Sequence, residues 1–138
     1  MADYDVVVVG AGNAALCAAL AARENGARVL ILEAAPEHER GGNSTFTAGG
    51  FRFCHSGVED AATDVLTDLS EAERERIVLP VHDRDVFYQT LMKVTHHQAD
   101  ETMAWRLIDG SRPAMVWLRK HGIRFIPMFG RQSFEVEG

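Results

Sequence analysis

Residues 4–15 read Tyr4-Asp5-Val6-Val7-Val8-Val9-Gly10-Ala11-Gly12-Asn13-Ala14-Ala15. The four consecutive valines predict a strand that is buried on both faces, as in a parallel sheet. Two glycines follow the strand directly, and an alanine- and leucine-rich run predicts a helix from about Asn13 to Glu24. Gly26 lies where such a helix would end in a left-handed residue. This order of strand, glycine turn and helix predicts the start of a βαβ unit.

A second apolar run ends at Leu32 and is followed by an acidic residue, Glu33. In a dinucleotide-binding unit, the first glycine permits the tight turn and the second lets a pyrophosphate approach the backbone. A small third residue lets the helix pack closely on the strand, and Gly10, Gly12 and Ala15 have this spacing. The acid after the second strand accepts hydrogen bonds from a ribose hydroxyl group. The alternative is an ordinary glycine turn with a solvated Glu33, but strand, helix and acid together favour a dinucleotide site.

Residues 40–53 form a second informative segment, with two Gly-Gly pairs within ten residues. Such pairs exclude ordinary helix or strand and indicate backbone that lies close to a flat or anionic group. Side chains between the pairs offer amide and hydroxyl groups for phosphate or ring-edge contacts. The alternative is a flexible surface loop. Three aromatic residues in the segment, Phe46, Phe51 and Phe53, favour ligand contact instead.

Composition sets the broad class of the protein. The 138 residues match the size of one domain, and a hydrophobic content of 46% suffices for a core. A net charge of −6 predicts no nucleic-acid partner and no anionic membrane surface. The first apolar stretch is interrupted by Asn13 and Arg23, so we predict neither a signal peptide nor a transmembrane segment. Two cysteines without a C-x-x-C pair, Cys17 and Cys54, are typical of a reducing cytoplasm.

The remainder of the chain predicts short helices and one further strand. We expect helices over 60–69, 71–79, 83–97 with Asp83 as N-cap, from Asp100 onward, and from a Ser111 cap to Gly122, with Pro113 in the first turn. Adjacent histidines on a helix, His96 and His97, point about 100° apart. They cannot hold one metal ion jointly, and no metal site is predicted.

The number of strands suggests an incomplete sheet. A dinucleotide-binding sheet normally has about five or six parallel strands. The sequence offers two strands and one short candidate, Ile123 to Pro127. We therefore expect residues 1–138 to be the front of a longer protein.

The glycine motifs, together with the segment from Ala104 to Gly122, resemble the flavoproteins of the succinate dehydrogenase/fumarate reductase family. The resemblance implies an α/β fold, a Rossmann-like FAD-binding domain with a parallel sheet. Residues 1–138 would form its N-terminal segment within a larger two-domain flavoprotein. In this family the first Gly-Gly segment lines the FAD pyrophosphate and ribityl chain, and the second lies against the isoalloxazine ring. The implied cofactor-binding residues are Gly10, Ala11, Gly12, Asn13, Ala14, Ala15, Glu33, Ala34, Arg40, Gly41, Gly42, Asn43, Ser44, Ala48, Gly49 and Gly50.

The resemblance also implies an activity, an FAD-dependent oxidoreductase acting on a C–C bond of a small carboxylate. Residues 41–52 are most similar to tricarballylate dehydrogenase, which forms cis-aconitate. Fumarate or urocanate reductase, ketosteroid dehydrogenase and a non-catalytic dinucleotide-binding module are the alternatives. An electron-accepting protein or a quinone-linked partner would complete the reaction.

Two departures from the family pattern concern the site. Membrane-complex members carry a histidine, bonded to the flavin, at the place of Asn43, so non-covalent FAD is expected here. The family's acid/base arginine and most carboxylate-binding residues come from segments far downstream. Arg52 and His55 are the local candidates for these tasks, and no catalytic residue is assigned.

Overall fold

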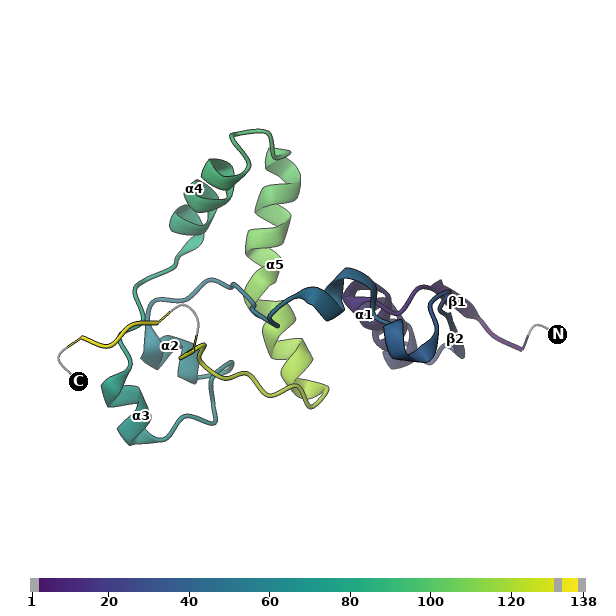
Figure 1. Ribbon diagram of the computed structural model, residues 1–138, viewed down its shortest axis with the longest axis horizontal. Coiled ribbons are helices and arrows are strands. Elements are labelled where there is room, and N and C mark those ends of the chain that lie inside the picture. Colours follow the sequence, from purple (N-terminus) through teal and green to yellow (C-terminus); the bar gives the residue numbers. More distant parts are fainter. Residues whose placement is uncertain (1–2, 131–132, 137–138) are drawn as a thin grey trace. The chain divides into compact units, whose positions relative to one another are not determined.

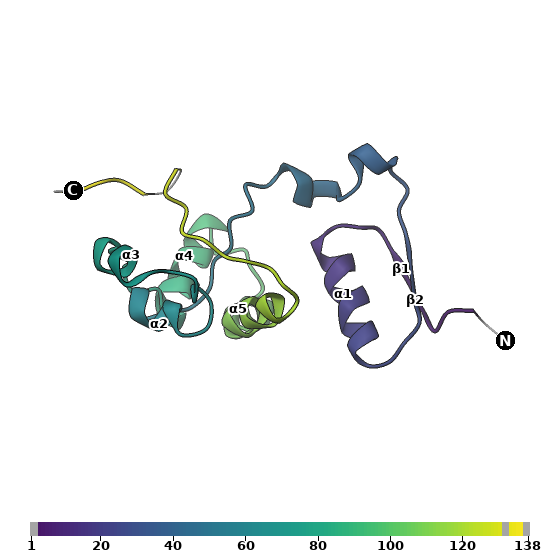
Figure 2. The same ribbon diagram turned by 90° about the horizontal axis from the view of Figure 1, so that it is seen from below.

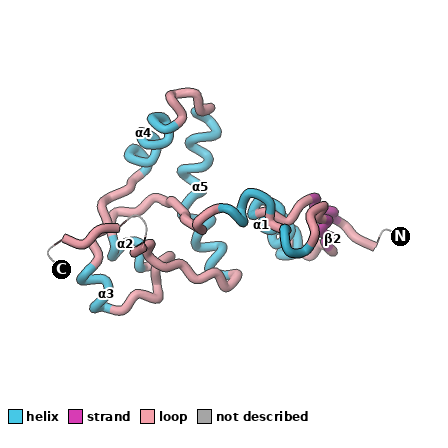
Figure 3. Tube along the Cα trace, viewed as in Figure 1, coloured by secondary structure: helices cyan, strands magenta, loops and turns pink. Residues whose placement is uncertain are grey.

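The structure is a computed structural model that describes residues 3–130 and 133–136. The chain divides into two compact units, residues 1–50 and 51–138. Within the described residues, strands occur in the first unit, whereas the second consists of helices joined by loops (Figure 3). Each unit is described by itself.

The first unit is a parallel βαβ unit followed by two short 3-10 helices. Its elements are β1 (Val6–Val9), α1 (Asn13–Glu24), β2 (Val29–Leu32), η1 (Glu37–Glu39) and η2 (Gly42–Phe46). The strands pair in parallel, with Val6 opposite Val29 and Val9 opposite Leu32. Figures 1 and 2 show α1 running alongside the two strands. The predicted α/β fold with a parallel sheet is confirmed.

The prediction that strand β1 is buried on both faces is wrong within this unit. Val6 and Val8 are half-buried, but Val7 is 53% exposed and Val9 is 83% exposed. Side chains of a strand alternate between its two faces. Among the described residues of the first unit, α1 is the one long helix, so a single helical layer packs on the sheet. The valine run is therefore covered on one face within this unit.

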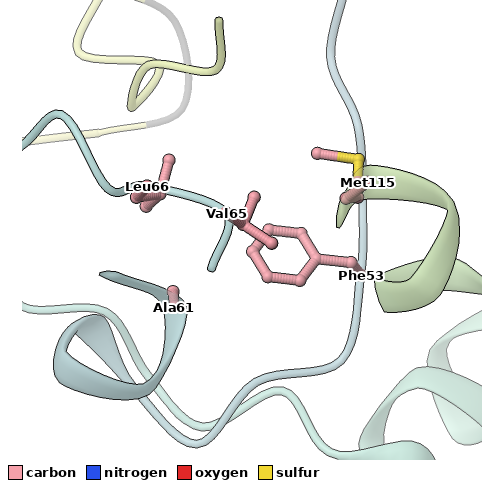
Figure 4. Close-up of a cluster of buried hydrophobic side chains, with 5 residues drawn as sticks. All are labelled: Phe53, Ala61, Val65, Leu66 and Met115. Atoms are coloured by element: carbon pink, nitrogen blue, oxygen red, sulfur yellow. The ribbon is translucent and has the colours of Figure 1, made fainter. Parts of the chain in front are cut away.

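The described residues of the second unit form four α-helices and a buried apolar cluster. The helices are α2 (Val58–Ala62), α3 (Glu71–Arg76), α4 (Arg84–Val94) and α5 (Glu101–Lys120), and α4 packs against α5 (Figure 1). Figure 4 shows the buried cluster, which lies between α2, α5 and the loops beside them and is made of Phe53, Ala61, Val65, Leu66 and Met115. The helix starts predicted at Asp83 and Asp100 are confirmed: Asp83 accepts from the Val86 N–H at 2.9 Å, and Asp100 from the Met103 N–H at 2.8 Å.

The expected helix start at Ser111 is wrong, because α5 runs without interruption through Pro113. The buried side chains of α5 recur at helical spacing and form one apolar stripe along its length. The stability gained from this packing offsets the cost of the backbone hydrogen bond that a proline cannot donate. Ser111 itself is buried, donates to the Ile108 carbonyl oxygen at 2.7 Å and accepts from the Cys54 N–H at 3.2 Å. The stripe consists of Ala104, Ile108, Ser111 and Met115.

The other predicted elements of the second unit need smaller corrections. The helix expected over 60–69 is α2, which ends at Ala62, and the one expected over 71–79 is α3, which ends at Arg76. No strand forms over 123–127, because no described strand of this unit offers it a hydrogen-bonding partner. Phe125 packs against the apolar cluster instead, with its ring centroid 5.3 Å from that of Phe51.

The helix expected to reach His97 ends at Val94, because the next residues turn into the left-handed region. His96 has φ of 51° and His97 has φ of 58°. The His96 N–H donates to the Lys93 carbonyl oxygen at 3.2 Å, and the His97 N–H to that of Met92 at 2.8 Å. This pair of bonds is a Schellman motif, with His96 at the position that glycine usually occupies. The helices α1 and α5 end with the same two bonds but carry Gly26 and Gly122 there.

The comparison of these three helix ends predicts that His96→Gly stabilises the protein. A left-handed conformation costs a residue with a Cβ atom about 1 kcal/mol or more, and glycine avoids that cost. We expect the free energy of unfolding to rise by about 1 kcal/mol in denaturant titration. Gly26→Ala, the opposite change at the equivalent position of α1, should lower it by a similar amount. A loss of stability in His96→Gly would contradict the interpretation.

Candidate functional site

The turn between β1 and α1 presents backbone N–H groups at a helix N-terminus. Gly10 has φ of 101°, a left-handed value that a side chain would strain, and its N–H donates to the Leu32 carbonyl oxygen at 2.6 Å. Gly12 is the N-cap of α1 with φ of −76°, a backbone conformation that other residue types can also adopt. The first turn of α1 contains no acidic residue. The N–H groups of Ala14 and Ala15 have no hydrogen-bond partner among the described residues. Unsatisfied amides and the helix dipole make this end favourable for an anion.

Glu33 lies directly after β2 and reaches back to this turn. Its Oε2 accepts from the Ala11 N–H at 2.8 Å, and its Oε1 accepts from the Ala35 N–H at 2.9 Å. The hydrogen bonds from Ala35 and then Ala11 lower the pKa of the Glu33 carboxyl, so it is ionised at neutral pH. A carboxylate oxygen has two lone pairs, so both oxygens can accept further hydrogen bonds. The carboxylate therefore lies beside the glycine turn and can still accept from a ligand hydroxyl group.

The first Gly-Gly segment folds against the N-terminus of α1. Gly41 has φ of 105°, and a Cβ atom there would lie 2.5 Å from Thr45 Oγ1. Ser44 Oγ accepts from the Asn13 N–H at 3.1 Å. A Cβ atom on Gly12 would lie 3.4 Å from the Gly41 carbonyl oxygen, so the two segments are close. The structure brings together two predicted segments that are separated by about thirty residues of chain.

The other predicted cofactor-binding residues are less closely associated with the glycine turn. Arg40 forms an exposed ion pair with Glu37 at 3.0 Å, and Asn43 is exposed within η2. Ala48, Gly49 and Gly50 are exposed, and the Gly49 N–H is bonded to Thr47 Oγ1 at 3.3 Å. No hydrogen bond among the described residues joins the second Gly-Gly pair to the glycine turn. Its contact with a flavin ring stays a prediction.

Arg52 and His55, the local candidates for chemistry, belong to the second unit. The His55 ring lies between other rings, with centroid distances of 5.2 Å to Phe53 and 5.9 Å to His82. Burial lowers the pKa of His55, followed by the charges of His82 and Arg112, against the opposing effect of Asp60. This environment is that of a packed side chain, and no acid/base role follows from it.

Sequence reasoning missed two residues that organise the surroundings of this segment. His82 pairs with His55, backbone to backbone, across 27 positions of sequence. Ser111, which lies within α5, accepts a hydrogen bond from the Cys54 N–H. Neither contact has a local sequence signal. For Ser111, the helical spacing of Ala104, Ile108 and Met115 could have indicated that it lies inside a helix.

Among residues 3–130 and 133–136, no three His, Cys, Asp or Glu side chains are grouped to hold a metal ion. In the same part of the chain, no helix combines the length and the apolar character that crossing a bilayer requires. Cys17 and Cys54 are both free.

Comparisons with known proteins identify the family of this chain. Residues 5–137 match the family model described as FAD binding domain. NADH:fumarate oxidoreductase of Klebsiella pneumoniae (strain 342) is 31% identical over 121 residues, which are 88% of this chain and 11% of that protein. Vinyl phenol reductase of Lactiplantibacillus plantarum is 31% identical over 89% of this chain and 21% of its own length. A fumarate reductase (cytochrome) of Shewanella frigidimarina is 30% identical over 78% of this chain and 18% of its own length.

The chain thus spans about a fifth or less of the length of these relatives. No solved structure is significantly similar to it. The family model nevertheless covers nearly all residues, including the glycine turn, Glu33 and both Gly-Gly segments. This chain belongs to the FAD binding domain family.

Proposed function

We propose that this chain is the N-terminal part of an FAD-dependent reductase that saturates a C–C double bond of a small carboxylate. The observation that carries the proposal is the position of residues 41–44 against the N-terminus of α1. It brings Gly41 to Ser44 beside the N–H groups at the start of α1, and Glu33 is hydrogen-bonded to Ala11 of the same turn. Together these groups would contact a pyrophosphate and a ribose, which are parts of a dinucleotide.

The residues present fit FAD. The amides at the start of α1 would hold the pyrophosphate, Glu33 the ribose hydroxyl groups, and Gly41 to Ser44 the chain beyond the pyrophosphate. Gly12 supports this fit, because its φ of −76° does not itself demand glycine. A bare backbone at that position is what a closely approaching phosphate needs. FAD, when bound, supplies the transfer of a hydride to or from carbon.

The mode of FAD attachment is inferred from Asn43, which by the resemblance to the succinate dehydrogenase/fumarate reductase family stands where members with a covalent flavin carry a histidine. A carboxamide nitrogen is a hydrogen-bond donor and not a nucleophile. We therefore propose non-covalent FAD. Further residues for proton transfer and for the substrate carboxylates would come from parts of the protein outside this chain. A cytoplasmic location belongs to the same proposal.

The direction of the reaction is proposed from the relatives. Two of them are named as reductases, of vinyl phenol and of fumarate, and a third is named NADH:fumarate oxidoreductase. They favour reduction over the tricarballylate dehydrogenation that the motif over 41–52 resembles. The tricarballylate type of reaction is kept as the second candidate on that motif alone. An electron-donating or electron-accepting protein, or a quinone-linked partner, belongs to the same proposal.

Activity assays on the longer protein that contains this chain test the proposal. The flavin-loaded protein would be mixed anaerobically with a reduced viologen dye and, in turn, fumarate, urocanate, cis-aconitate or a vinyl phenol. The reverse assay would use tricarballylate or succinate with an oxidising dye. We expect dye oxidation with an unsaturated carboxylate, and none with residues 1–138 alone.

The other outcomes distinguish the alternatives. Turnover confined to tricarballylate oxidation would replace the reductase by the dehydrogenase. A flavin-loaded protein without turnover in either direction would contradict both and favour a non-catalytic dinucleotide-binding module.

A further inference from the structure

His55 and His82 form an isolated antiparallel bridge in the second unit. The His55 N–H donates to the His82 carbonyl oxygen at 3.0 Å, and the His82 N–H donates to that of His55 at 2.9 Å. The bridge ties the segment that enters the apolar cluster at Phe53 to the residue that precedes Asp83, the N-cap of α4. Two backbone hydrogen bonds thus join two parts of the chain that are distant in sequence.

The side chains of the bridge lie in a row of four rings. Centroid distances are 5.2 Å from Phe53 to His55, 5.9 Å from His55 to His82, and 4.9 Å from His82 to Phe87. Phe53 and Phe87, at the two ends of the row, are 8% and 6% exposed. Nδ1 of His55 and Nε2 of His82 are buried and have no hydrogen-bond partner among the described residues. The row therefore accommodates two imidazoles in their neutral form.

The charged groups around His55 do not stabilise its protonated form. Asp60 of α2 and Arg112 of α5 face it, along with His82. The Asp60 carboxylate is already engaged, by Arg112 Nη1 at 2.6 Å and by the Ser56 N–H at 2.8 Å. A proton on His55 would thus lie beside a cation and a second imidazole, and the carboxylate that faces it is already paired with Arg112.

The charged groups around His82 likewise do not stabilise its protonated form. Arg52 and Asp83 face it. The Asp83 carboxylate accepts from the Val86 N–H as the N-cap of α4. Burial first, and then Arg52, lower the pKa of His82, while Asp83 opposes them.

We propose that the His55–His82 bridge is an acid-sensitive latch, closed when both imidazoles are neutral and opened when either takes up a proton. Both histidines have a pKa below the ordinary value of 6.5 in the folded chain. Folding therefore favours their neutral forms, and their contribution to stability is complete above pH 6.5. It is lost as the pH falls below that value. Opening would free Arg52 to Ser56 from the entry to α4, and this segment continues directly from the Gly49-Gly50 loop.

Amide hydrogen exchange of the 138-residue chain, followed by NMR at pH 7.5 and pH 5, tests the latch. Protection factors corrected for intrinsic exchange should fall severalfold at the His55 and His82 amides on acidification. The Met115 amide, inside α5, should keep its protection. Imidazole resonances of the two histidines should titrate over the pH range in which the bridge loses protection. Unchanged protection, or titration outside that range, would overturn the proposal.

Variants provide a second test. His55→Phe with His82→Phe keeps two rings in the row and leaves nothing to titrate, so its bridge amides should stay protected at pH 5. His38→Gln serves as the matched control, because this side chain is 79% exposed and should leave the pH response as in the parent. Persistence of the response in the double phenylalanine variant would contradict the latch. The wild-type titration decides the question if that variant does not fold.

Discussion

Replacing Arg112 by alanine is expected to lower the free energy of unfolding by about 2–3 kcal/mol. Its guanidinium joins α5 to the α2 region through Asp60 Oδ2 at 2.6 Å, Asp64 Oδ1 at 3.0 Å and the Asp60 carbonyl oxygen at 2.9 Å. The Arg112 side chain is 25% exposed, and that of Asp60 is 32% exposed. Removing one partner leaves two carboxylates close together in a partly dry site, which costs more than an exposed ion pair.

The pH dependence of this loss follows from Asp60. Its hydrogen bond from Arg112, and then that from the Ser56 N–H, lower the pKa of the Asp60 carboxyl. A lowered carboxyl pKa contributes stability above the unfolded value of 3.8, and the contribution is lost as the pH falls through the folded value. The gap between wild type and Arg112→Ala should therefore be full at pH 7 and shrink below pH 3.8 in denaturant titrations.

Arg84→Ala is the matched control for Arg112→Ala. Arg84 also pairs with an aspartate across two helices, Asp109 at 2.6 Å, but its side chain is 61% exposed. Solvent screens that pair, so its loss should cost clearly less. Equal losses in the two variants would contradict the view that the Arg112 cluster holds α2 to α5.

Glu33→Ala is expected to weaken FAD binding roughly ten- to a hundredfold, the range for losing a hydrogen bond to a charged group. The variant removes the ribose acceptor proposed here and also the bond from the Ala11 N–H that shapes the glycine turn. Equilibrium titration of the flavin-free longer protein with FAD, followed by flavin fluorescence, measures the dissociation constant. Glu33→Gln, which keeps one acceptor oxygen, should lose less.

Glu39→Ala is the control for the Glu33 variants. Glu39 is an acid of the same unit whose side chain is 66% exposed and pairs with His38. We expect it to bind FAD as the parent does. An unchanged dissociation constant in Glu33→Ala would show that this carboxylate serves the turn alone.

The strands and the helix of the βαβ unit could be predicted almost to the residue, because their signals are local. The valine run, the glycine turn and the alanine-rich stretch each favour one structure over a few neighbouring residues. Gly26 marks the end of α1 for the same reason. The burial of β1 could not be obtained this way, since it depends on which other elements cover the sheet.

The second unit was harder to predict because distant contacts override local signals there. Ser111 and Pro113 together are typical of a helix start, yet the buried stripe along α5 carries the helix through them. His96 and His97 continue a helical pattern but terminate the helix in a Schellman motif. The bridge between His55 and His82 has no signal in either segment alone.

The candidate site was predicted as a set of segments rather than as a geometry. Sequence spacing indicated the glycine turn, Glu33 and the Gly-Gly pairs. The bond from the Asn13 N–H to Ser44 Oγ, which unites the turn with the first pair, depends on the path of the chain through η1 and η2. Such a path is set by backbone conformations at Gly41 and Gly42 that spacing does not specify.

The binding of non-covalent FAD can be tested on the longer protein, purified without added cofactor. Its visible spectrum is recorded first, and the protein is then precipitated with acid. We expect flavin absorption bands in the native protein and all of the flavin, as FAD, in the acid supernatant. Flavin retained in the pellet would contradict the non-covalent attachment argued from Asn43. A colourless protein that binds NADH tightly would contradict the assignment of this glycine turn, with Glu33 and Gly41 to Ser44, to FAD.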